Sequence, residues 1–325
     1  MLIDNPPNPL LRIHHPEQVD LLLAWTAQVC GLGAVHGHTV CESGYDDCNL
    51  TVVTERGRFL VKVFTTARPA HLTRRYVDVL ECVLRAGVSH PALHGPPGGH
   101  LLHHPASGNQ LVVMDHLDHG DFLERGEHPN DAQLDDLMRQ VCRVHAVERE
   151  FPAVHDWWAT PNIAALARDV LPLLDDDDRG RVSGAVELFA RLDLATLPHA
   201  LVHGDLTKAN VIPTSDHTVA VIDFAVANRY PRVHELAMIA VNLMHGDPRG
   251  YDARLAELVR RYAVADPLSP RELDALPVYV YATAAMELLG SVRESVRKGN
   301  RSAENDYLIQ LGRTAVDAAA RLVDR

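Results

Sequence analysis

A polar loop framed by two apolar runs constrains this chain more than any other part of its sequence. Residues 201–205 read Leu-Val-His-Gly-Asp, and Asn210 follows five residues after Asp205. A second apolar run, residues 219–222, ends directly at Asp223. Each run is typical of a short buried strand. The pattern therefore predicts two strands that deliver carboxylate and amide side chains to one loop region.

The spacing of these polar residues suits phosphoryl transfer. One carboxylate must accept the proton of an attacking hydroxyl, and we assign this role to Asp205. Mg²⁺ prefers hard oxygen ligands, which Asn210 and Asp223 supply, and it would neutralise charge on the transferred phosphate. The structural alternative is that Asp and Asn serve only as turn or cap residues here.

The arrangement of His203, Asp205, Asn210 and Asp223 resembles the catalytic segment of the protein-kinase-like superfamily. His203-Gly204-Asp205 replaces the His-Arg-Asp of protein kinases, and Ala225 replaces the Gly of their Asp-Phe-Gly. Both features are similar to the small-molecule branch, which includes aminoglycoside phosphotransferases, choline kinases and homoserine kinases. The resemblance implies that Asp205 is the base and that His203 holds the catalytic loop. Lys208 would contact the transferred phosphate or face solvent.

The resemblance extends over nearly the whole chain and implies a two-lobed α+β fold. Hydrophobic periodicity agrees with a small antiparallel sheet and one long helix, followed by helices. The predicted strands are 49–54, 59–64 and 110–114, and the predicted helices are 17–31, 70–86, 131–147, 161–174, 179–192, 233–245, 252–263, 269–291 and 303–323. We expect an N-lobe at 1–114, a hinge at 115–117 and a helical C-lobe at 118–325.

Lys62 lies inside the apolar run 59–64, where a charged side chain needs a reason. The resemblance implies that this lysine contacts the nucleotide phosphates and pairs with a helix carboxylate. Glu81 is the first choice for that carboxylate, because it follows Lys62 at the spacing of homoserine kinases. Asp78, one turn earlier, is the alternative, and a surface position for either acid remains open.

The nucleotide loop and the hinge are predicted from weaker signals. Residues 42–49 contain no Gly-x-Gly-x-x-Gly motif, so Ser43, Gly44 and Asn49 are the candidates for phosphate contacts. Asp46 and Asp47 would repel phosphate, so we expect either that they point outward or that this turn does not close on the nucleotide. Residues 114–117 resemble the hinge that reads a purine base through backbone hydrogen bonds. The candidate hinge residues are Met114, Asp115 and Leu117, and either ATP or GTP suits them.

Composition and charge narrow the partners. The net charge is −12, with −1 in residues 1–114 and −11 in residues 115–325. Such a surface disfavours nucleic acid and anionic membranes, and the acidic C-lobe suits a cationic or neutral ligand better than an anionic one. The N-terminus lacks the basic and apolar regions of a secretory signal. Five cysteines without a Cys-x-x-Cys pair are typical of reduced thiols in the cytoplasm.

The acceptor is predicted to be a small molecule with a hydroxyl group. An antibiotic or other natural product is the leading candidate, which would make the chain a resistance enzyme. Homoserine or another amino alcohol is the second, and a nucleotide-binding protein without catalysis is the third. The C-lobe residues considered for acceptor binding are Trp157, Trp158, Arg229, Arg232, Asp247, Glu287 and Glu294.

Overall fold

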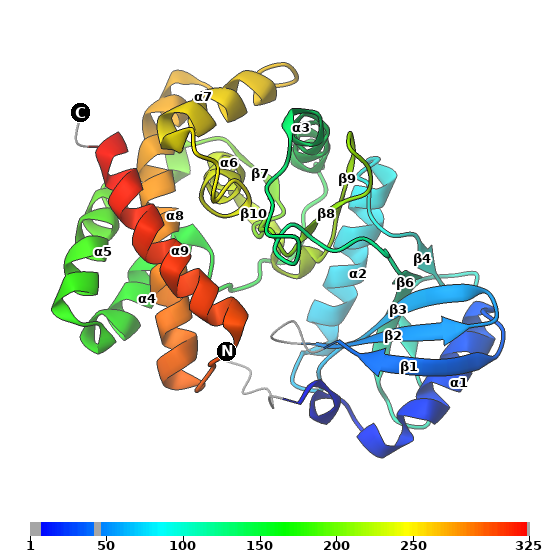
Figure 1. Ribbon diagram of the computed structural model, residues 1–325. Coiled ribbons are helices and arrows are strands. Elements are labelled where there is room, and N and C mark those ends of the chain that lie inside the picture. The colour runs from blue at the N-terminus through cyan, green and yellow to red at the C-terminus, as the bar shows by residue number, and fades with distance from the viewer. Residues whose placement is uncertain (1–7, 42–46, 324–325) are drawn as a thin grey trace. The chain divides into compact units, whose positions relative to one another are not determined.

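The computed structural model describes residues 8–41 and 47–323, which divide into two compact units. The first unit contains residues up to 82 and residues 90–118, and the second contains 83–89 and 119 onward. The structure is α+β, with an antiparallel sheet in the first unit and a mainly helical second unit (Figure 1). The predicted fold class is therefore confirmed.

The first unit is built around a sheet with the strand order β1-β2-β3-β6-β4, in which β5 also pairs with β6. All its pairs are antiparallel, and the β2–β3 hairpin places Asn49 opposite Lys62. Its elements are α1 (Val19–Cys30), β1 (Val35–Val40), β2 (Cys48–Thr54), β3 (Gly57–Val63), α2 (Ala70–Arg85), β4 (Leu93–His94), β5 (Leu102–His103) and β6 (Gln110–Asp115).

Alternation along β3 decides where Lys62 points. Val61 and Val63 belong to the apolar core that the sheet shares with α1, which includes Leu22 and Leu23. Because side chains alternate across a strand, Lys62 lies on the opposite face. Its ammonium group sits there over a ring of α2, 5.0 Å from the centroid of Tyr76.

The second unit places two short strand pairs among helices. The pair β7–β10 is antiparallel, and so is the pair β8–β9. Its elements are α3 (Asp131–His145), α4 (Ile163–Val170), α5 (Asp176–Phe189), β7 (His199–Val202), β8 (Val211–Pro213), β9 (Val219–Val221), β10 (Asn228–Pro231), α6 (Val233–Met238), a π-helical turn (Ile239–Leu243), α7 (Gly250–Tyr262), α8 (Pro270–Arg297) and α9 (Ala303–Ala319).

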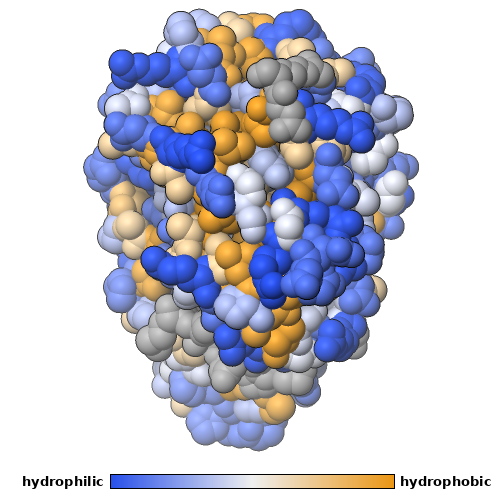
Figure 2. Space-filling model, turned by 90° about the vertical axis from the view of Figure 1, so that its left-hand side faces the viewer, coloured by the Kyte–Doolittle hydropathy of each residue, from blue (hydrophilic) through white to orange (hydrophobic). Residues whose placement is uncertain are grey.

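Helix α8 organises this unit. It begins with a capping box, in which Ser269 and Glu272 bond each other's backbone N–H groups, and it packs against α4, α5, α6 and α9. Among the described residues it alone is long and apolar enough to cross a membrane, but 83% of its apolar window is buried inside the protein. That burial makes it a core helix. On the face that Figure 2 shows, hydrophilic residues cover much of the surface, with apolar patches between them.

Candidate active site

His203 holds the loop that follows β7. Its Nδ1 atom accepts the backbone N–H of Asp205 at 3.2 Å, which leaves Nε2 to donate to the carbonyl oxygen of Ile222 at 2.8 Å. Complete burial lowers the pKa of His203 and keeps the ring neutral. With both ring nitrogens engaged, His203 ties the backbone at Asp205 to the residue before Asp223. It is therefore a positioning residue for the loop.

Asn210 joins the two halves of the predicted site. Its side-chain NH₂ donates to Asp205 Oδ2 at 2.7 Å and to the Asp205 carbonyl oxygen at 3.0 Å. The backbone carbonyl oxygen of Asn210 accepts the backbone N–H of Ile222 at 3.0 Å. The β8–β9 register, which pairs Val211 with Val221, explains this proximity. Asp205, Asn210 and Asp223 are thus brought together as predicted.

Asp223 adopts a backbone conformation that non-glycine residues rarely use. Its φ is 61°, in the left-handed region, and its Oδ1 accepts the N–H of Ala225 at 3.3 Å. Asp tolerates this region better than most residues because its short side chain bonds locally. The next residue, Phe224, is fully buried and packs on the His203 ring at a centroid distance of 4.4 Å. The turn therefore aims Asp223 by anchoring the residue after it.

The donors near Asp205 fit a magnesium ion. Asp223 supplies carboxylate oxygens, and Asn210 supplies an amide oxygen whose NH₂ partner is already committed to Asp205. Mg²⁺ is commonly held by one or two such protein oxygens together with substrate phosphates and water. Asn210 and Asp223 would hold the ion.

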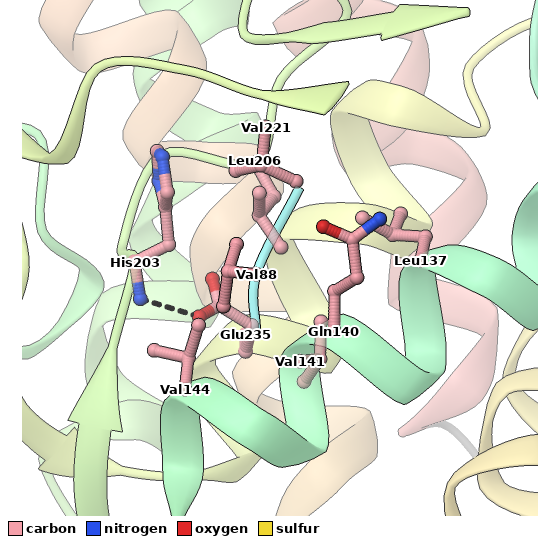
Figure 3. A pocket seen from close by; sticks show the side chains of 9 residues that line it. All are labelled: Val88, Leu137, Gln140, Val141, Val144, His203, Leu206, Val221 and Glu235. Atoms are coloured by element: carbon pink, nitrogen blue, oxygen red, sulfur yellow. Dashed lines mark hydrogen bonds between the residues drawn. The ribbon is translucent and has the colours of Figure 1, made fainter. Parts of the chain in front are cut away.

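Glu235 holds the backbone of the loop that follows β7. Its two carboxylate oxygens accept the N–H of His203 at 2.5 Å and the N–H of Gly204 at 3.2 Å. Figure 3 shows it at one side of a small, mainly apolar pocket lined by α3 side chains such as Val141 and Val144. Burial alone would raise the pKa of Glu235, but neighbouring histidines, including His145 at 3.8 Å, lower it overall. Glu235 is therefore an ionised brace for the loop.

Asp205 lies within a group of carboxylates. Burial raises its pKa well above the ordinary aspartate value, and the nearby charges of Asp156, Glu287 and Asp223 raise it further. The hydrogen bond from Asn210 acts in the opposite direction. A carboxylate with a raised pKa is a better proton acceptor near neutral pH. The group also concentrates negative charge where an acceptor hydroxyl must approach.

The loop containing Asp156 is fixed to α8. Trp158 packs so closely on Gly290 that a Cβ there would lie 2.6 Å from the indole ring, and the Trp157 ring lies 4.7 Å from the guanidinium of Arg293. Both tryptophans thus anchor the loop. Asp156 Oδ1 accepts the N–H of Trp158 at 2.9 Å, which orients this acid.

Lys62 lies beside the carboxylate of Asp47, a neighbour that we did not predict from the sequence. Asp47 Oδ2 lies 3.4 Å from Lys62 Nζ and accepts a hydrogen bond from Arg68 at 3.0 Å, while its Oδ1 accepts the N–H of Thr65. Asp47 is only 5% exposed. The prediction that it points outward is wrong, because these donors outweigh the cost of burying its charge.

The other predicted nucleotide residues remain predictions. Glu81 contacts His100 Nδ1 at 2.9 Å, and Asp78 lies 3.6 Å from Arg74. Asn49 is on β2, and its Oδ1 is buried without a hydrogen-bond partner among the described residues. Ser43, Gly44 and Asp46 lie outside the described residues.

The hinge prediction changes in detail. The N–H of Asp115 bonds to the carbonyl of Ala92, and the N–H of His116 bonds to that of Arg58. The N–H groups of Asp115 and His116 are therefore bonded within the protein, whereas a purine base would need free backbone groups here. Met114 is buried within the same strand, and base recognition by Met114, Asp115 and Leu117 stays a prediction.

Four predicted acceptor residues have other partners. Asp247 binds the guanidinium of Arg249, and Glu294 lies 3.0 Å from Lys298. Arg229 pairs with Glu150 on the surface. Arg232 bonds to Glu272 at the start of α8, and also to Asp266. The Arg232 guanidinium is therefore committed to this helix cap and to Asp266, which speaks against its use in acceptor binding.

Comparison with known proteins decides the family. Residues 38–273 match the model of the phosphotransferase enzyme family, APH. The chain belongs to this family. It is a small-molecule phosphotransferase, and the catalytic segment described above lies wholly within the matched region.

Relatives of this phosphotransferase are distant. It is 25% identical to a homoserine kinase of Methylobacillus flagellatus over 251 residues, which cover 72% of each chain. Its fold is similar to a spectinomycin phosphotransferase in complex with ADP and spectinomycin (TM-score 0.70, 10% identity, 94% and 98% coverage). It is also similar to a choline/ethanolamine kinase family protein of Mesorhizobium loti (TM-score 0.63, 14% identity, 95% coverage of both chains).

One further residue of this phosphotransferase was missed from the sequence. Asn242, in the π-helical turn, accepts the N–H of Lys208 at 3.1 Å and donates to Glu287 Oε1 at 3.2 Å. It links the catalytic loop to α8. An Asn inside an apolar helical stretch was the available signal, and π-helical turns are frequent at functional sites.

Proposed function

We propose that this phosphotransferase transfers the γ-phosphate of ATP to the hydroxyl of a small molecule that carries a protonated amine. The carboxylate group of Asp156, Asp205, Asp223 and Glu287 carries this proposal. Asp205 is the proposed base and Asp223 the proposed magnesium ligand. Proton transfer and metal binding do not require Asp156 or Glu287. Glu287 is only 2% exposed. A buried carboxylate is costly unless a cation neutralises it, so this group of acids supports a cationic acceptor.

In the reaction, Asp205 accepts the hydroxyl proton as the acceptor oxygen forms its bond to the γ-phosphorus and the bond to the β-phosphate bridge breaks. Asn210 holds the Asp205 carboxylate through Oδ2. His203 and Glu235 hold the backbone on which Asp205 is carried. Bound Mg²⁺ would neutralise charge on the transferred group. ADP and the phosphorylated acceptor are the products.

A small amino alcohol is the first candidate acceptor. The homoserine kinase of Methylobacillus flagellatus covers 72% of this chain, and its named substrate carries both an amine and a hydroxyl. An amine-bearing antibiotic is the second candidate, because the same acidic group would attract it and a spectinomycin phosphotransferase shares the fold. A cytoplasmic location agrees with the use of ATP.

The test is a coupled turnover assay with Mg²⁺ and either ATP or GTP. The acceptors are homoserine, choline, other amino alcohols, spectinomycin and aminoglycosides, each compared with its amine-free or amine-acylated analogue. The Asp205→Asn variant is the blank. We expect turnover only with amine-bearing acceptors. Equal turnover of an acceptor and its amine-free analogue would contradict the proposal.

A further inference from the structure

Lys208 is a buried cation without an anionic partner. It is 7% exposed, and among the described residues its Nζ forms no hydrogen bond or ion pair. Arg254 lies close enough for its charge to act on the Lys208 ammonium group. Two cations thus lie near each other within a strongly acidic unit.

Arg254 is also incompletely satisfied. Its terminal nitrogens donate to the backbone carbonyls of Ala240 and Asp247, so no carboxylate neutralises it directly. The Asp247 carboxylate itself binds Arg249. Arg254 Nε is buried and has no hydrogen-bond partner among the described residues. The arginine is 6% exposed, so water does not replace a missing partner easily.

Two tyrosine hydroxyls complete this cluster. Tyr251 lies under Arg254, with the guanidinium 4.8 Å from its ring centroid, and its hydroxyl is buried without a partner in the described chain. Tyr307 has a hydroxyl in the same condition. Its ring lies 6.0 Å from that of His245, whose pKa of about 4 leaves the imidazole neutral. An unpartnered buried polar group destabilises the folded protein, and a bound ligand that supplies the missing partner would remove that destabilisation.

The cluster lies next to the acidic group on the acceptor side of the catalytic loop. Asn242 connects them, because it bonds the N–H of Lys208 and Oε1 of Glu287. Glu287 also influences the titration of Tyr251 and Tyr307. The cations Lys208 and Arg254 and the carboxylate of Glu287 thus lie on either side of the Asn242 side chain.

We propose that Lys208, Arg254 and Tyr251 form an anion subsite for the acceptor's carboxylate, beside the Glu287 carboxylate that takes its ammonium group. The acceptor class is then an α-amino acid with a hydroxyl on its side chain. This inference rests on the proposed function and narrows it, since choline and amine-bearing antibiotics lack the carboxylate. The transferred phosphoryl group is the other oxyanion that these cations could meet.

The experiment compares three hydroxy amino acids with their decarboxylated counterparts. The pairs are homoserine with 3-aminopropan-1-ol, serine with ethanolamine, and threonine with 1-aminopropan-2-ol. We expect kcat/KM for one amino acid to exceed that of its counterpart by about ten- to a hundredfold, the worth of one charge-assisted hydrogen bond of about 1.5–3 kcal/mol. Equal use of both members, or turnover confined to an antibiotic, overturns the inference and leaves the proposed function intact. No turnover with any amine-bearing acceptor overturns both.

Two variants assign the subsite. Lys208→Met keeps the side-chain length, and Tyr251→Phe removes only one hydroxyl group, so neither should unfold the protein. Each is expected to reduce the preference for the carboxylate-bearing member of the pair, with Lys208→Met reducing it by about tenfold or more. Lys298→Met is the matched control and should keep the preference.

The same variants distinguish the two sources of oxyanion. If Lys208 contacts the phosphoryl group, Lys208→Met slows both members of a pair by the same factor and also slows nucleotide hydrolysis without acceptor. The preference ratio then stays constant, and this result overturns the carboxylate assignment.

Discussion

Glu235 Oε2 accepts the backbone N–H of His203 at 2.5 Å, and Oε1 accepts that of Gly204 at 3.2 Å. One buried carboxylate thus holds the two residues that precede Asp205. Both donors belong to a loop whose backbone has no helix or sheet partner at this point. The geometry of Asp205, the proposed base, therefore depends on a side chain that is fully buried.

The Glu235→Gln variant is expected to lose activity with little loss of nucleotide affinity. A carboxamide presents an NH₂ group to one of the two loop N–H groups, so one charge-assisted bond of about 1.5–3 kcal/mol is lost. We expect kcat to fall by about ten- to a hundredfold in the turnover assay, while the nucleotide Kd from calorimetry changes by less than about twofold. Glu187→Gln, on the exposed face of α5, is the control. An unchanged kcat would remove Glu235 from loop positioning.

Replacing Asp205 by Asn tests the base. The amide cannot accept the hydroxyl proton, so we expect kcat to fall by about 10²–10⁴. Nucleotide binding should remain near the wild-type value, because Asn210 and Asp223 are unchanged. A variant that keeps more than about a tenth of the wild-type kcat would exclude Asp205 as the base.

The pH dependence of KM tests Glu287. Burial raises its pKa to about 7, so the carboxyl group is neutral below that pH and charged above it. An ammonium-bearing acceptor is attracted only to the charged form. We therefore expect KM for the amine acceptor to decrease as pH rises from about 6 to about 8, and Glu287→Gln to raise KM and flatten this dependence. A KM that increases over this range in the wild type would contradict the assignment.

The same substitution should stabilise the protein at alkaline pH. The folded-state pKa of Glu287, about 7, lies above the ordinary value of 4.5, so the folded state binds the proton more tightly than the unfolded chain does. Its contribution to stability is complete below the unfolded pKa and is lost as pH rises through 7. Glu287→Gln should therefore raise the free energy of unfolding by up to about 3 kcal/mol at pH 8 and change it little at pH 4.5. Denaturant melts at the two pH values measure this difference.

Asp47→Asn tests the buried ion cluster of the first unit. The substitution leaves Lys62 and Arg68 without a carboxylate that both contact. Breaking a buried pair in this way costs about 3–5 kcal/mol. Asp118→Asn is the control, because Asp118 is exposed and pairs with Arg58 at the surface, where a pair is worth about 0–1 kcal/mol. Similar melting temperatures for the two variants would show that the Asp47 cluster contributes no more than a surface pair.

Local pattern predicted most of the helices and the site core, because those features depend on neighbours in the sequence. The run 219–222 is continuously apolar and predicts a buried strand, whereas the roles of residues in the loop 203–210 were implied by the resemblance to small-molecule kinases. The burial of Asp47 could not be predicted from its neighbours in the sequence, since it depends on contacts with Arg68 and with Lys62 of β3. Strands β1 and β10 were missed because His, Gly, Arg and Pro weaken their β pattern, and pairing with β2 and β7 overrides it. Asn242 was missed because its role depends on both Lys208 and Glu287.

Residues 83–89 belong to the second unit although the first unit surrounds them in the sequence. They are held there by Ser89, whose N–H donates to Gln140 and whose carbonyl accepts the N–H of Val221. Val83 and Val88 are buried at 0% and 4% exposure. A fragment that stops at residue 118 would therefore expose the apolar side chains of residues 83–89. A fragment that starts at residue 119 would lack these residues, which are part of its own core. Expression of either lobe alone calls for a circular permutant or a grafted peptide, because no single cut separates them.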